Sequence, residues 1–482
     1  MNSMYPTLKL YIDGVWRDGS EGASEPVYNP ATGEVIATLP HASRADLDDA
    51  LASSRAAFAK WKKVSAHERS TYLKKVAALL RERSEQISQV LTLEQGKPLP
   101  EARVEMVYTA DVFEWYAEEA RRTYGHIIPA RNTTHRQMVL KEPIGPALGL
   151  SPWNFPGIVP ARKIGAALAA GCVSIIKAAE ETPGTCVEIV RACHDAGIPA
   201  GVVNMVFGVP AEISSYLIAS DVIRQVSFTG SIPVGKHLAR LASDNLIRCT
   251  LELGGHAPVI VLKDADVRKA ARVAATGKFY RNAGQVCVSP TRFLVEAPVY
   301  DAFVEEMTTI ANSVKVGDGA VEGTEMGPLA NPRRLDVMEE LVADARARGA
   351  KITAGGNRVG NQGNFWAPTV IADVTTECQI MNDEPFGPLA PIMPVDSLDA
   401  ALAEANRLPV GLASYVFTNA MDTARQAAEE IEAGVVTINH VIASMAETPF
   451  GGVKQSGDGR EGGAEGLEEF LVTKYVSEGP AV

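Results

Sequence analysis

The segment from residue 146 to 255 alternates short β-rich runs with helical runs, and this alternation constrains the fold more than any other feature of the chain. The expected strands are 147–150, 172–176, 202–207, 224–228 and 247–251, and the expected helices between them are 162–170, 186–196, 212–219 and 234–242. Strands that alternate with helices build a parallel sheet with helices on both faces. The sequence therefore predicts an α/β protein with a doubly wound parallel sheet.

Polar residues that could bind a ligand follow the expected strands. In sheets of this kind, ligands bind beyond the carboxyl ends of the strands. The residues at those ends are Trp153-Asn154, Lys177, Gly208, Thr229-Gly230-Ser231 and Glu252. Several of these residue types handle phosphate, ribose or protons, so we expect a functional site at this edge of the sheet.

The rest of the chain predicts further helices and a second set of strands. Ser43 and Asp46 have the spacing of a capping box at the start of a helix, and a second helical run extends from residue 68 to about 94. After residue 255 we expect strands at 259–262 and 293–295 and helices around 299–313 and 334–348. The length of 482 residues is enough for more than one domain.

Charge and composition limit the classes of partner. The formal net charge of −12 argues against the basic surface that nucleic-acid binding needs. No apolar run approaches the length of a membrane span, which is about 18 residues or more, and the first residues do not have the pattern of a signal peptide. Six cysteines in so long a chain suggest reduced thiols. We therefore expect a cytoplasmic protein with no nucleic-acid or membrane partner.

A turn at residues 230–236 lies between an expected strand and an expected helix. It almost completes a phosphate-binding P-loop, but His237 stands where magnesium needs a Ser or Thr hydroxyl. ATP or GTP hydrolysis is therefore not expected. The turn either receives a dinucleotide pyrophosphate, with the help of Ser231, or is an ordinary connection. Lys177 and Glu180, after an earlier strand, could hold ribose hydroxyls.

Cys287 is the candidate nucleophile among the cysteines. No two cysteines have C-x-x-C spacing, so neither a metal site nor thioredoxin-like chemistry is expected. Cys287 ends the polar run Arg281–Cys287, and a nucleophilic thiol needs a second group to manage protons. Glu252, which two glycines follow closely, suits that role. A Cys–His pair stays open on spacing alone, although no histidine lies in a comparable motif.

Seven motifs follow one another along the chain: Pro152-Trp-Asn-Phe-Pro156, Lys177-x-x-Glu180, Phe228-Thr-Gly-Ser231, Glu252-Leu-Gly-Gly255, Gly284-Gln-x-Cys287, Glu384-Pro-Phe-Gly-Pro388 and Pro449-Phe-Gly-Gly452. In this order they resemble the aldehyde dehydrogenase superfamily over essentially the whole chain. The nearest resemblance is to the semialdehyde branch, which includes succinate-semialdehyde and 2-oxoglutarate-semialdehyde dehydrogenases. The runs Ala211–Tyr216 and Ala330–Leu335 favour the second of these.

The resemblance implies a reaction and a catalytic set, which consists of Asn154, Lys177, Glu252 and Cys287. In this reaction Cys287 attacks the aldehyde carbon, and the Asn154 amide and the Cys287 backbone N–H hold the oxyanion. Hydride transfer to a nicotinamide leaves a thioester, and Glu252 activates the water that releases the acid. Glu461 matches a position that relays protons in some members of the family.

The resemblance also implies a site for NAD, with NADP possible. Its cofactor-binding residues are Trp153, Lys177, Glu180, Gly208, Thr229, Gly230, Ser231, Val234, Leu253, Glu384 and Phe386. The family's usual Lys-Pro-Ser-Glu is Lys177-Ala-Ala-Glu180 here, which loses a proline and keeps both charged ends. Since the Glu180 carboxylate repels a 2′-phosphate and accepts from a free 2′-hydroxyl, we expect NAD to be preferred.

Two arginines, Arg162 and Arg281, match positions that bind the distal carboxylate of the substrate in semialdehyde members. Guanidinium groups pair with carboxylates in a bidentate geometry, so the match predicts an ω-carboxylated aldehyde. An isolated arginine is more commonly a surface charge, and that interpretation stays open.

The resemblance implies three structural parts. Residues 1–121 and 143–254 form the NAD-binding domain, 255–455 the catalytic domain, and 122–142 with 456–482 a small oligomerisation element. A homodimer or homotetramer is therefore expected.

Three other functions stay open. They are a broad-specificity aldehyde dehydrogenase, an acylating enzyme that passes its thioester to coenzyme A, and a non-catalytic binding protein on the same fold. Glu252 argues against the acylating enzyme, and the joint presence of Asn154, Glu252 and Cys287 argues against the non-catalytic protein.

Overall fold

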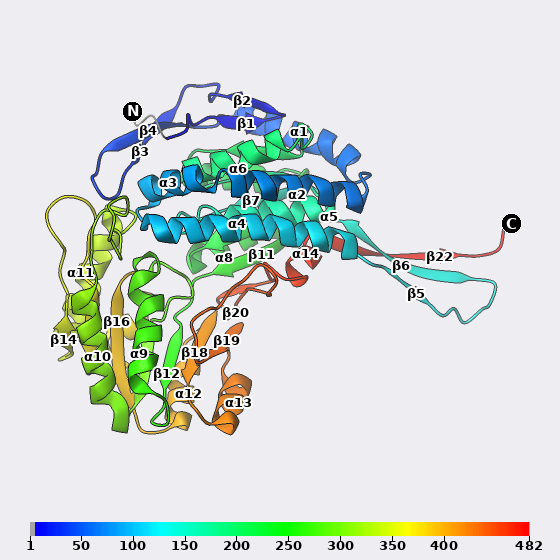
Figure 1. Ribbon diagram of the computed structural model, residues 1–482. Coiled ribbons are helices and arrows are strands. Elements are labelled where there is room, and N and C mark those ends of the chain that lie inside the picture. Colours follow the sequence, from blue (N-terminus) through cyan, green and yellow to red (C-terminus); the bar gives the residue numbers. More distant parts are fainter. Residues whose placement is uncertain (1–4, 482) are drawn as a thin grey trace.

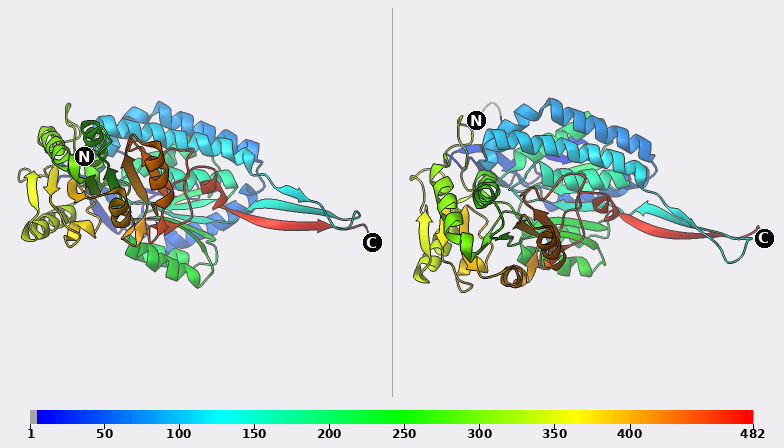
Figure 2. Two further views of the ribbon diagram at one scale, coloured as in Figure 1. Left: turned by 90° about the horizontal axis from the view of Figure 1, so that it is seen from below. Right: turned by 60° about the horizontal axis from the view of Figure 1, so that its bottom comes forward.

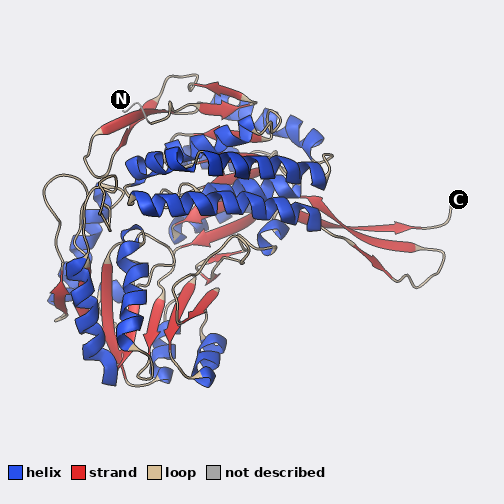
Figure 3. Ribbon diagram, in the orientation of Figure 1, coloured by secondary structure: helices blue, strands red, loops and turns tan. Residues whose placement is uncertain are grey.

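The computed structural model describes residues 5–481. It has two α/β lobes, each built around its own sheet and its own hydrophobic core, and an arm that extends away from both (Figure 1, Figure 2). Figure 3 shows that the arm consists of strands and loops, whereas helices surround the sheets of the two lobes.

The first lobe is built around an eight-stranded sheet in the order β2-β1-β9-β8-β7-β10-β11-β21. Its strands are β1 (Leu10–Ile12), β2 (Val15–Arg17), β7 (Ala147–Leu150), β8 (Ser174–Lys177), β9 (Val203–Val206), β10 (Gln225–Gly230), β11 (Arg248–Leu253) and β21 (Gly457–Asp458). The strands from β7 to β11 are parallel to their neighbours within this group. The predicted doubly wound parallel sheet is thus confirmed.

Helices connect and cover these strands close to the expected positions. They are α1 (Arg44–Trp61), α2 (Ala66–Glu82), α3 (Ser84–Gln95), α4 (Leu99–Glu119), η1 (Ala120–Arg122), α5 (Ile158–Ala170), α6 (Pro183–Asp195), α7 (Pro210–Ile218) and α8 (Ile232–Ser243). Ser43 and Asp46 form the expected capping box at the start of α1. The helical run expected from residue 68 to 94 is instead two helices, because Arg83 leaves the helical conformation between them (φ −97°, ψ 6°).

The order of the strands reverses at β7. The chain passes from β7 outward to β8 and β9 and then crosses to the other side of β7, where it forms β10 and β11. Loops that leave neighbouring strands in opposite directions open a crevice at the carboxyl ends, which is the usual ligand site of such sheets. The sequence 151–157 after β7 and the turn after β10 border this crevice.

The second lobe is built around a seven-stranded sheet in the order β14-β15-β16-β13-β12-β18-β19. Its strands are β12 (Pro258–Val261), β13 (Arg292–Glu296), β14 (Lys351–Ala354), β15 (Thr369–Ala372), β16 (Leu389–Val395), β18 (Ala413–Phe417) and β19 (Val435–Ile438). Its helices and helical turns are α9 (Val267–Ala275), η2 (Thr276–Tyr280), η3 (Asn282–Gly284), η4 (Ala297–Val299), α10 (Tyr300–Ser313), α11 (Pro332–Ala347), η5 (Gln379–Met381), α12 (Leu398–Asn406) and α13 (Met421–Glu430). All strand pairs except β14 with β15 are parallel.

The arm is an antiparallel sheet in the order β22-β6-β5, made of β5 (His126–Ile128), β6 (Arg136–Pro143) and β22 (Leu471–Glu478). It therefore pairs the hairpin near residues 122–142 with the C-terminal segment. Large apolar side chains on it are exposed, including Ile127 (70%) and Tyr475 (55%).

The remaining elements are small. They are the pair β3 (Ser24–Tyr28) and β4 (Val35–Pro40), the pair β17 (Val410–Gly411) and β20 (Val453–Lys454), and the helix α14 (Glu465–Glu468). Within residues 5–481, no helix combines the length and the apolar character that crossing a membrane requires.

Candidate active site

A cavity of about 340 Å³ lies where the carboxyl ends of the first sheet meet the second lobe. Residues that the sequence analysis singled out make up much of its wall: Trp153, Asn154, Arg162, Thr229, Gly230, Ser231, Glu252, Leu253, Arg281, Cys287, Glu384 and Phe386. The fold thus brings into one cavity residues that are far apart in the sequence.

Cys287 reaches this cavity after an irregular turn. The π-helical turn η2 continues α9, and Asn282, Ala283 and Gly284 then adopt left-handed backbone conformations (φ 46°, 50° and 73°). A Cβ atom at Gly284 would lie 2.4 Å from the carbonyl oxygen of Gly387, so this turn requires glycine. Left-handed non-glycine residues cost free energy and are frequent at functional sites.

The surroundings of Cys287 favour the protonated thiol. The pKa of this thiol is raised to about 12, mainly by burial and in part by the nearby Glu384 and Glu252 carboxyls, whereas Arg281 and Arg162 oppose the rise. The thiolate, rather than the thiol, is the nucleophilic form of cysteine. A reaction at Cys287 therefore needs a group that takes its proton.

Glu252 is the candidate for this group. It lies near the end of β11 with a buried side chain, and neither of its carboxyl oxygens has a hydrogen-bond partner among residues 5–481. Burial raises the pKa of Glu252 well above its ordinary value, and the nearby Glu461 carboxyl raises it further. A carboxyl with a raised pKa is a stronger base than an ordinary carboxylate when it is deprotonated.

Asn154 is fixed by contacts to both its backbone and its side chain. Its carbonyl oxygen accepts hydrogen bonds from Lys97 Nζ (2.9 Å) and Asn282 Nδ2 (3.0 Å), and its own Nδ2 donates to the carbonyl oxygen of Gln285 (3.0 Å). Lys97 also forms a buried ion pair with Glu105 at 2.6 Å. The Asn154 amide is therefore held beside the segment that carries Cys287.

Lys163 and Glu461 form a buried ion pair at the cavity that Glu252 also lines. Lys163 Nζ lies 2.6 Å from Glu461 Oε1 and also donates to the hydroxyls of Ser227 (3.0 Å) and Thr229 (2.9 Å). The resemblance pointed to Glu461, but Lys163 was missed. The available signal was a lysine that directly follows Arg162 in a helix whose other residues are apolar or small, since a buried lysine requires a partner.

A larger cavity of about 1320 Å³ adjoins the first. Five residues line both cavities: Pro152 and four of the expected cofactor residues, Trp153, Thr229, Gly230 and Ser231. Three more of the expected cofactor residues line only the larger cavity: Lys177, Glu180 and Val234. Gly208 lines neither of them. The two cavities together follow the carboxyl ends of the first sheet and include the N-terminus of α8, where backbone N–H groups favour phosphate.

Two carboxyl groups along this path fit a sugar ligand. Glu180 pairs with Lys177 Nζ in the larger cavity. Burial raises the pKa of Glu384 to about 8, and its Oε1 has no partner within the described chain. Because buried polar atoms are nearly always hydrogen-bonded, this oxygen is suited to accept from a ligand hydroxyl. These residues therefore fit a nicotinamide dinucleotide.

Phe386 stands beside Glu384 in a strained conformation. Its backbone is left-handed (φ 44°), and its carbonyl oxygen accepts a hydrogen bond from Arg334 Nη2 at 3.3 Å. Its ring makes an edge contact with Trp153, with the ring centroids 5.5 Å apart. The contacts with Arg334 and Trp153 thus hold the Phe386 ring at the wall of the smaller cavity.

The arginine expected on α5 is not a surface charge. Arg162 is buried in the cavity wall, its Nη2 donates to Ser444 Oγ (2.5 Å), and its guanidinium lies 5.0 Å from the Phe450 ring centroid. Arg281 lies 5.6 Å from the Phe155 ring centroid. Sequence reasoning missed Ser444, which no recognisable motif contains.

The family model described as "Aldehyde dehydrogenase family" matches residues 16–476. The chain is 48% identical to 4-(hydroxymethyl)benzenesulfonate dehydrogenase of Comamonas testosteroni, with 98% of each chain covered. It is 41% identical to glutarate-semialdehyde dehydrogenase of Pseudomonas putida, with 97% of each covered.

A solved structure extends this similarity to the fold. Betaine aldehyde dehydrogenase of Staphylococcus aureus in complex with NAD+ superposes with a TM-score of 0.96 at 33% identity, over 99% of this chain and 96% of that one. Matched along nearly its whole length in both sequence and fold, the chain belongs to the aldehyde dehydrogenase family.

Proposed function

We propose that this member of the NAD(P)-dependent aldehyde dehydrogenases oxidises an aldehyde with an anionic group at its far end. The observation that carries the proposal is the buried guanidinium of Arg162 in the same cavity as Cys287 and Glu252. A buried cation is costly unless it is paired, and its Nε has no partner among residues 5–481. An anion on the substrate supplies that partner.

The chain's own groups divide the reaction into two steps. Glu252 takes the thiol proton as Cys287 attacks the carbonyl carbon, and the Asn154 amide and the Cys287 backbone N–H stabilise the oxyanion of the resulting thiohemiacetal. When bound, a nicotinamide cofactor would supply the hydride acceptor that oxidation of this adduct to a thioester requires.

Release of the product needs a second proton transfer. Glu252 deprotonates a water molecule, which attacks the thioester and expels the Cys287 thiolate as the acid leaves. The pair of Glu461 and Lys163 lies between Glu252 and the hydroxyls of β10, and we assign it the relay of the proton away from Glu252.

The anion on the substrate is a carboxylate or a sulfonate. Succinate semialdehyde and 2-oxoglutarate semialdehyde are the first candidates, and the similarity to glutarate-semialdehyde dehydrogenase supports them. A second candidate is an aromatic aldehyde with a sulfonate group. The aromatic walls formed by Phe155, Phe450 and Tyr108, and the similarity to 4-(hydroxymethyl)benzenesulfonate dehydrogenase, favour this second class.

We assign the dinucleotide to the larger cavity, with its nicotinamide end in the smaller one beside Glu384, and propose NAD as the preferred cofactor. Lys177 and Glu180 would hold the adenosine ribose, the α8 N-terminus with Ser231 the pyrophosphate, and Glu384 the nicotinamide ribose. A carboxylate at position 180 disfavours a 2′-phosphate by charge repulsion.

The same family membership supports a proposal about assembly and location. We propose that the arm (β5, β6 and β22) joins copies of the chain into a dimer or tetramer. We also propose that residues 1–121 with 143–254 act as the cofactor-binding domain and residues 255–455 as the catalytic domain. Six free thiols are compatible with a cytoplasmic location, which we retain as a proposal.

Replacing Arg162 tests the substrate class. In Arg162→Leu, KM for succinate or 2-oxoglutarate semialdehyde should rise about 10- to 100-fold, because a charge-assisted contact is lost, while butanal should be oxidised as before. NADH production with all three aldehydes and with 4-sulfobenzaldehyde measures this. An equal loss on charged and uncharged aldehydes would instead give Arg162 a structural role.

Labelling of Cys287 tests the protonation of the site. In the free enzyme, iodoacetamide should modify Cys287 slowly at pH 7, and the rate should rise about tenfold per pH unit, because the thiolate fraction grows in that way below the pKa. Mass spectrometry of the Cys287 peptide gives the rate, with Cys287→Ser as the control. A rate that is already maximal at pH 7 would mean that the resting group is a thiolate.

Cofactor choice depends on one carboxylate in this account. We expect the dissociation constant of NADP to exceed that of NAD by about tenfold or more, equivalent to about 1.4 kcal/mol. In Glu180→Gln the ratio of the two dissociation constants should be smaller, because the charge that repels the 2′-phosphate is removed. Glu181→Gln is the matched control, since its carboxylate faces Arg333 rather than Lys177. Equal affinity of the unmodified enzyme for both cofactors contradicts the proposal.

The assembly can be tested by light scattering at micromolar concentration. The unmodified chain should have a mass of two or four times 51.4 kDa, and Tyr475→Asp with Ile127→Asp should lower it, because charges on an apolar interface must be desolvated. Leu246→Asp, at an exposed position outside the arm, is the control. A monomer in the unmodified protein would remove the proposed role of the arm.

A further inference from the structure

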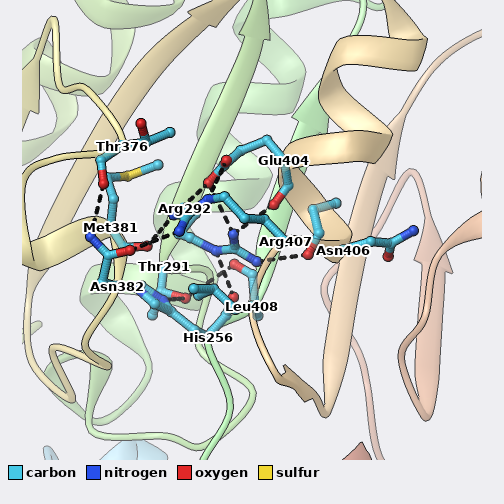
Figure 4. A network of polar contacts seen from close by, with 12 residues as sticks. His256, Thr291, Arg292, Thr376, Met381, Asn382, Glu404, Asn406, Arg407 and Leu408 are labelled. Atoms are coloured by element: carbon cyan, nitrogen blue, oxygen red, sulfur yellow. Dashed lines mark hydrogen bonds and ion pairs between the residues drawn. The ribbon is translucent and has the colours of Figure 1, made fainter.

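Segments that carry the site residues meet at one buried histidine in the second lobe (Figure 4). His256 follows Glu252 by four residues, and its Nδ1 lies 2.8 Å from Oγ1 of Thr291, which follows Cys287 by four residues. On the other side of the ring, Nε2 lies 3.0 Å from the carbonyl oxygen of Ile380. Through this one side chain, the segments that carry the proposed base Glu252 and the proposed nucleophile Cys287 are joined to Ile380. Ile380 lies four residues before the proposed cofactor residue Glu384, and we call the residues around Glu384 the cofactor loop.

We propose that His256 is a positioning residue that holds Glu252, Cys287 and Glu384 in register with one another. The inference rests on the roles that the proposed function gives to these three residues. His256 itself does not line either site cavity, so it acts through the segments that it joins.

The two contacts of the ring define its hydrogen positions. The carbonyl oxygen of Ile380 can only accept, so Nε2 of His256 carries a hydrogen and donates. Burial and the positive charge of Arg292 lower the pKa of His256 well below its ordinary value, and the ring is therefore neutral. Nδ1 is then an acceptor, and the Thr291 hydroxyl, which also lies 3.1 Å from the carbonyl oxygen of Ala257, has its single hydrogen between two acceptors, of which Nδ1 is the nearer at 2.8 Å.

The backbone around His256 is anchored as firmly as its ring. The Arg292 side chain is almost completely buried, and its Nε donates to the carbonyl oxygen of His256 (3.0 Å). Its Nη1 and Nη2 donate to the carbonyl oxygens of Glu404 (2.8 Å) and Ala405 (2.9 Å) at the end of α12. The base segment and the nucleophile strand are thus tied to the same helix end.

The cofactor loop is tied to this helix end as well. Arg407 pairs with the Glu404 carboxylate (2.7 Å) and donates to Asn382 Oδ1 (2.8 Å) and to the carbonyl oxygen of Met381 (3.1 Å). Met381 and Asn382 directly precede the loop of Glu384. The His256 ring adds a contact between this third segment and the other two, beside the hydrogen bond of the Gly255 backbone to the Glu384 carboxyl.

Variants that keep one ring contact at a time separate positioning from packing. His256→Gln keeps a donor near the place of Nε2 and loses the contact to Thr291. Thr291→Val removes the same contact from the other side, together with the contact of the Thr291 hydroxyl to the Ala257 carbonyl oxygen. His256→Asn keeps an acceptor near the place of Nδ1 and loses the contact to Ile380. His67→Gln, at an exposed position on α2, is the matched control.

Three measurements follow for each full-length variant: the melting temperature, the iodoacetamide labelling rate of Cys287, and the dissociation constant of NADH from fluorescence. In His256→Gln and Thr291→Val, labelling should change about tenfold while NADH affinity stays within about twofold of the unmodified enzyme, because displacements of about 1 Å cost up to 10²-fold in reaction rate. In His256→Asn, NADH affinity should fall about tenfold while labelling changes little.

The opposite pattern overturns the inference. If all His256 variants melt at lower temperature but keep both the labelling rate and the NADH affinity, the residue is only part of the core. If the labelling rate and the NADH affinity change together in every variant, the two ring contacts do not act on separate segments. Failure of the proposed function has a different signature, since the unmodified enzyme would then show no protection of Cys287 by aldehyde or cofactor.

Discussion

The chemistry of this site depends on one constraint, which is the burial of the Cys287 and Glu252 groups. Burial raises the pKa of both groups, so Cys287 favours the thiol and Glu252, as a carboxylate, is a stronger base than an exposed one. The thiol does not react by itself, and the reaction has to move its proton. The nearby Lys163–Glu461 pair and the fixed Asn154 amide supply polar groups at the cavity. Preorganised polar groups of this kind stabilise charge more strongly in a site of low polarity than in bulk water.

The same low polarity determines which ligands Arg162 favours. A guanidinium at the surface is hydrated and indifferent to what approaches, whereas a buried guanidinium with an open Nε favours an anion of matching geometry. Ser444 adds a hydroxyl beside it. Carboxylates and sulfonates both fit these hydrogen-bond donors. Relatives named for either kind of compound therefore support the proposal of an anionic substrate. Measured turnover of both kinds of aldehyde distinguishes between them.

The sequence predicted the first sheet well because strand and helix periodicities are local properties. The order of strands and helices from 147 to 253 is as expected, with ends shifted by a few residues. Of the expected catalytic set, Asn154, Glu252 and Cys287 line one cavity, whereas Lys177 lines only the larger cavity. The split between α2 and α3 at Arg83 was not predictable, because no proline or glycine marks it.

Contacts between distant segments could not be predicted from the sequence. Lys163 and Ser444 carry no motif, and their partners lie far away in the chain. Gly208, expected at the cofactor site, lines neither cavity, and its positive φ of 136° explains the glycine by the turn before α7. The anchoring of His256 is invisible for the same reason, since a histidine after two glycines has no local signature.

In the proposed reaction Cys287 forms a covalent acyl intermediate, and Glu252 activates the water that hydrolyses it. The most direct measurement is mixing of Glu252→Gln with NAD+ and succinate semialdehyde, followed by acid quench at a series of times and mass analysis of the Cys287 peptide. Because Glu252 also takes the thiol proton, we expect NADH to form more slowly than in the unmodified enzyme, up to about one equivalent per active site, with an acyl group retained on Cys287. NADH production that continues beyond one equivalent, or an unmodified Cys287 peptide after NADH has formed, would contradict these roles of Cys287 and Glu252.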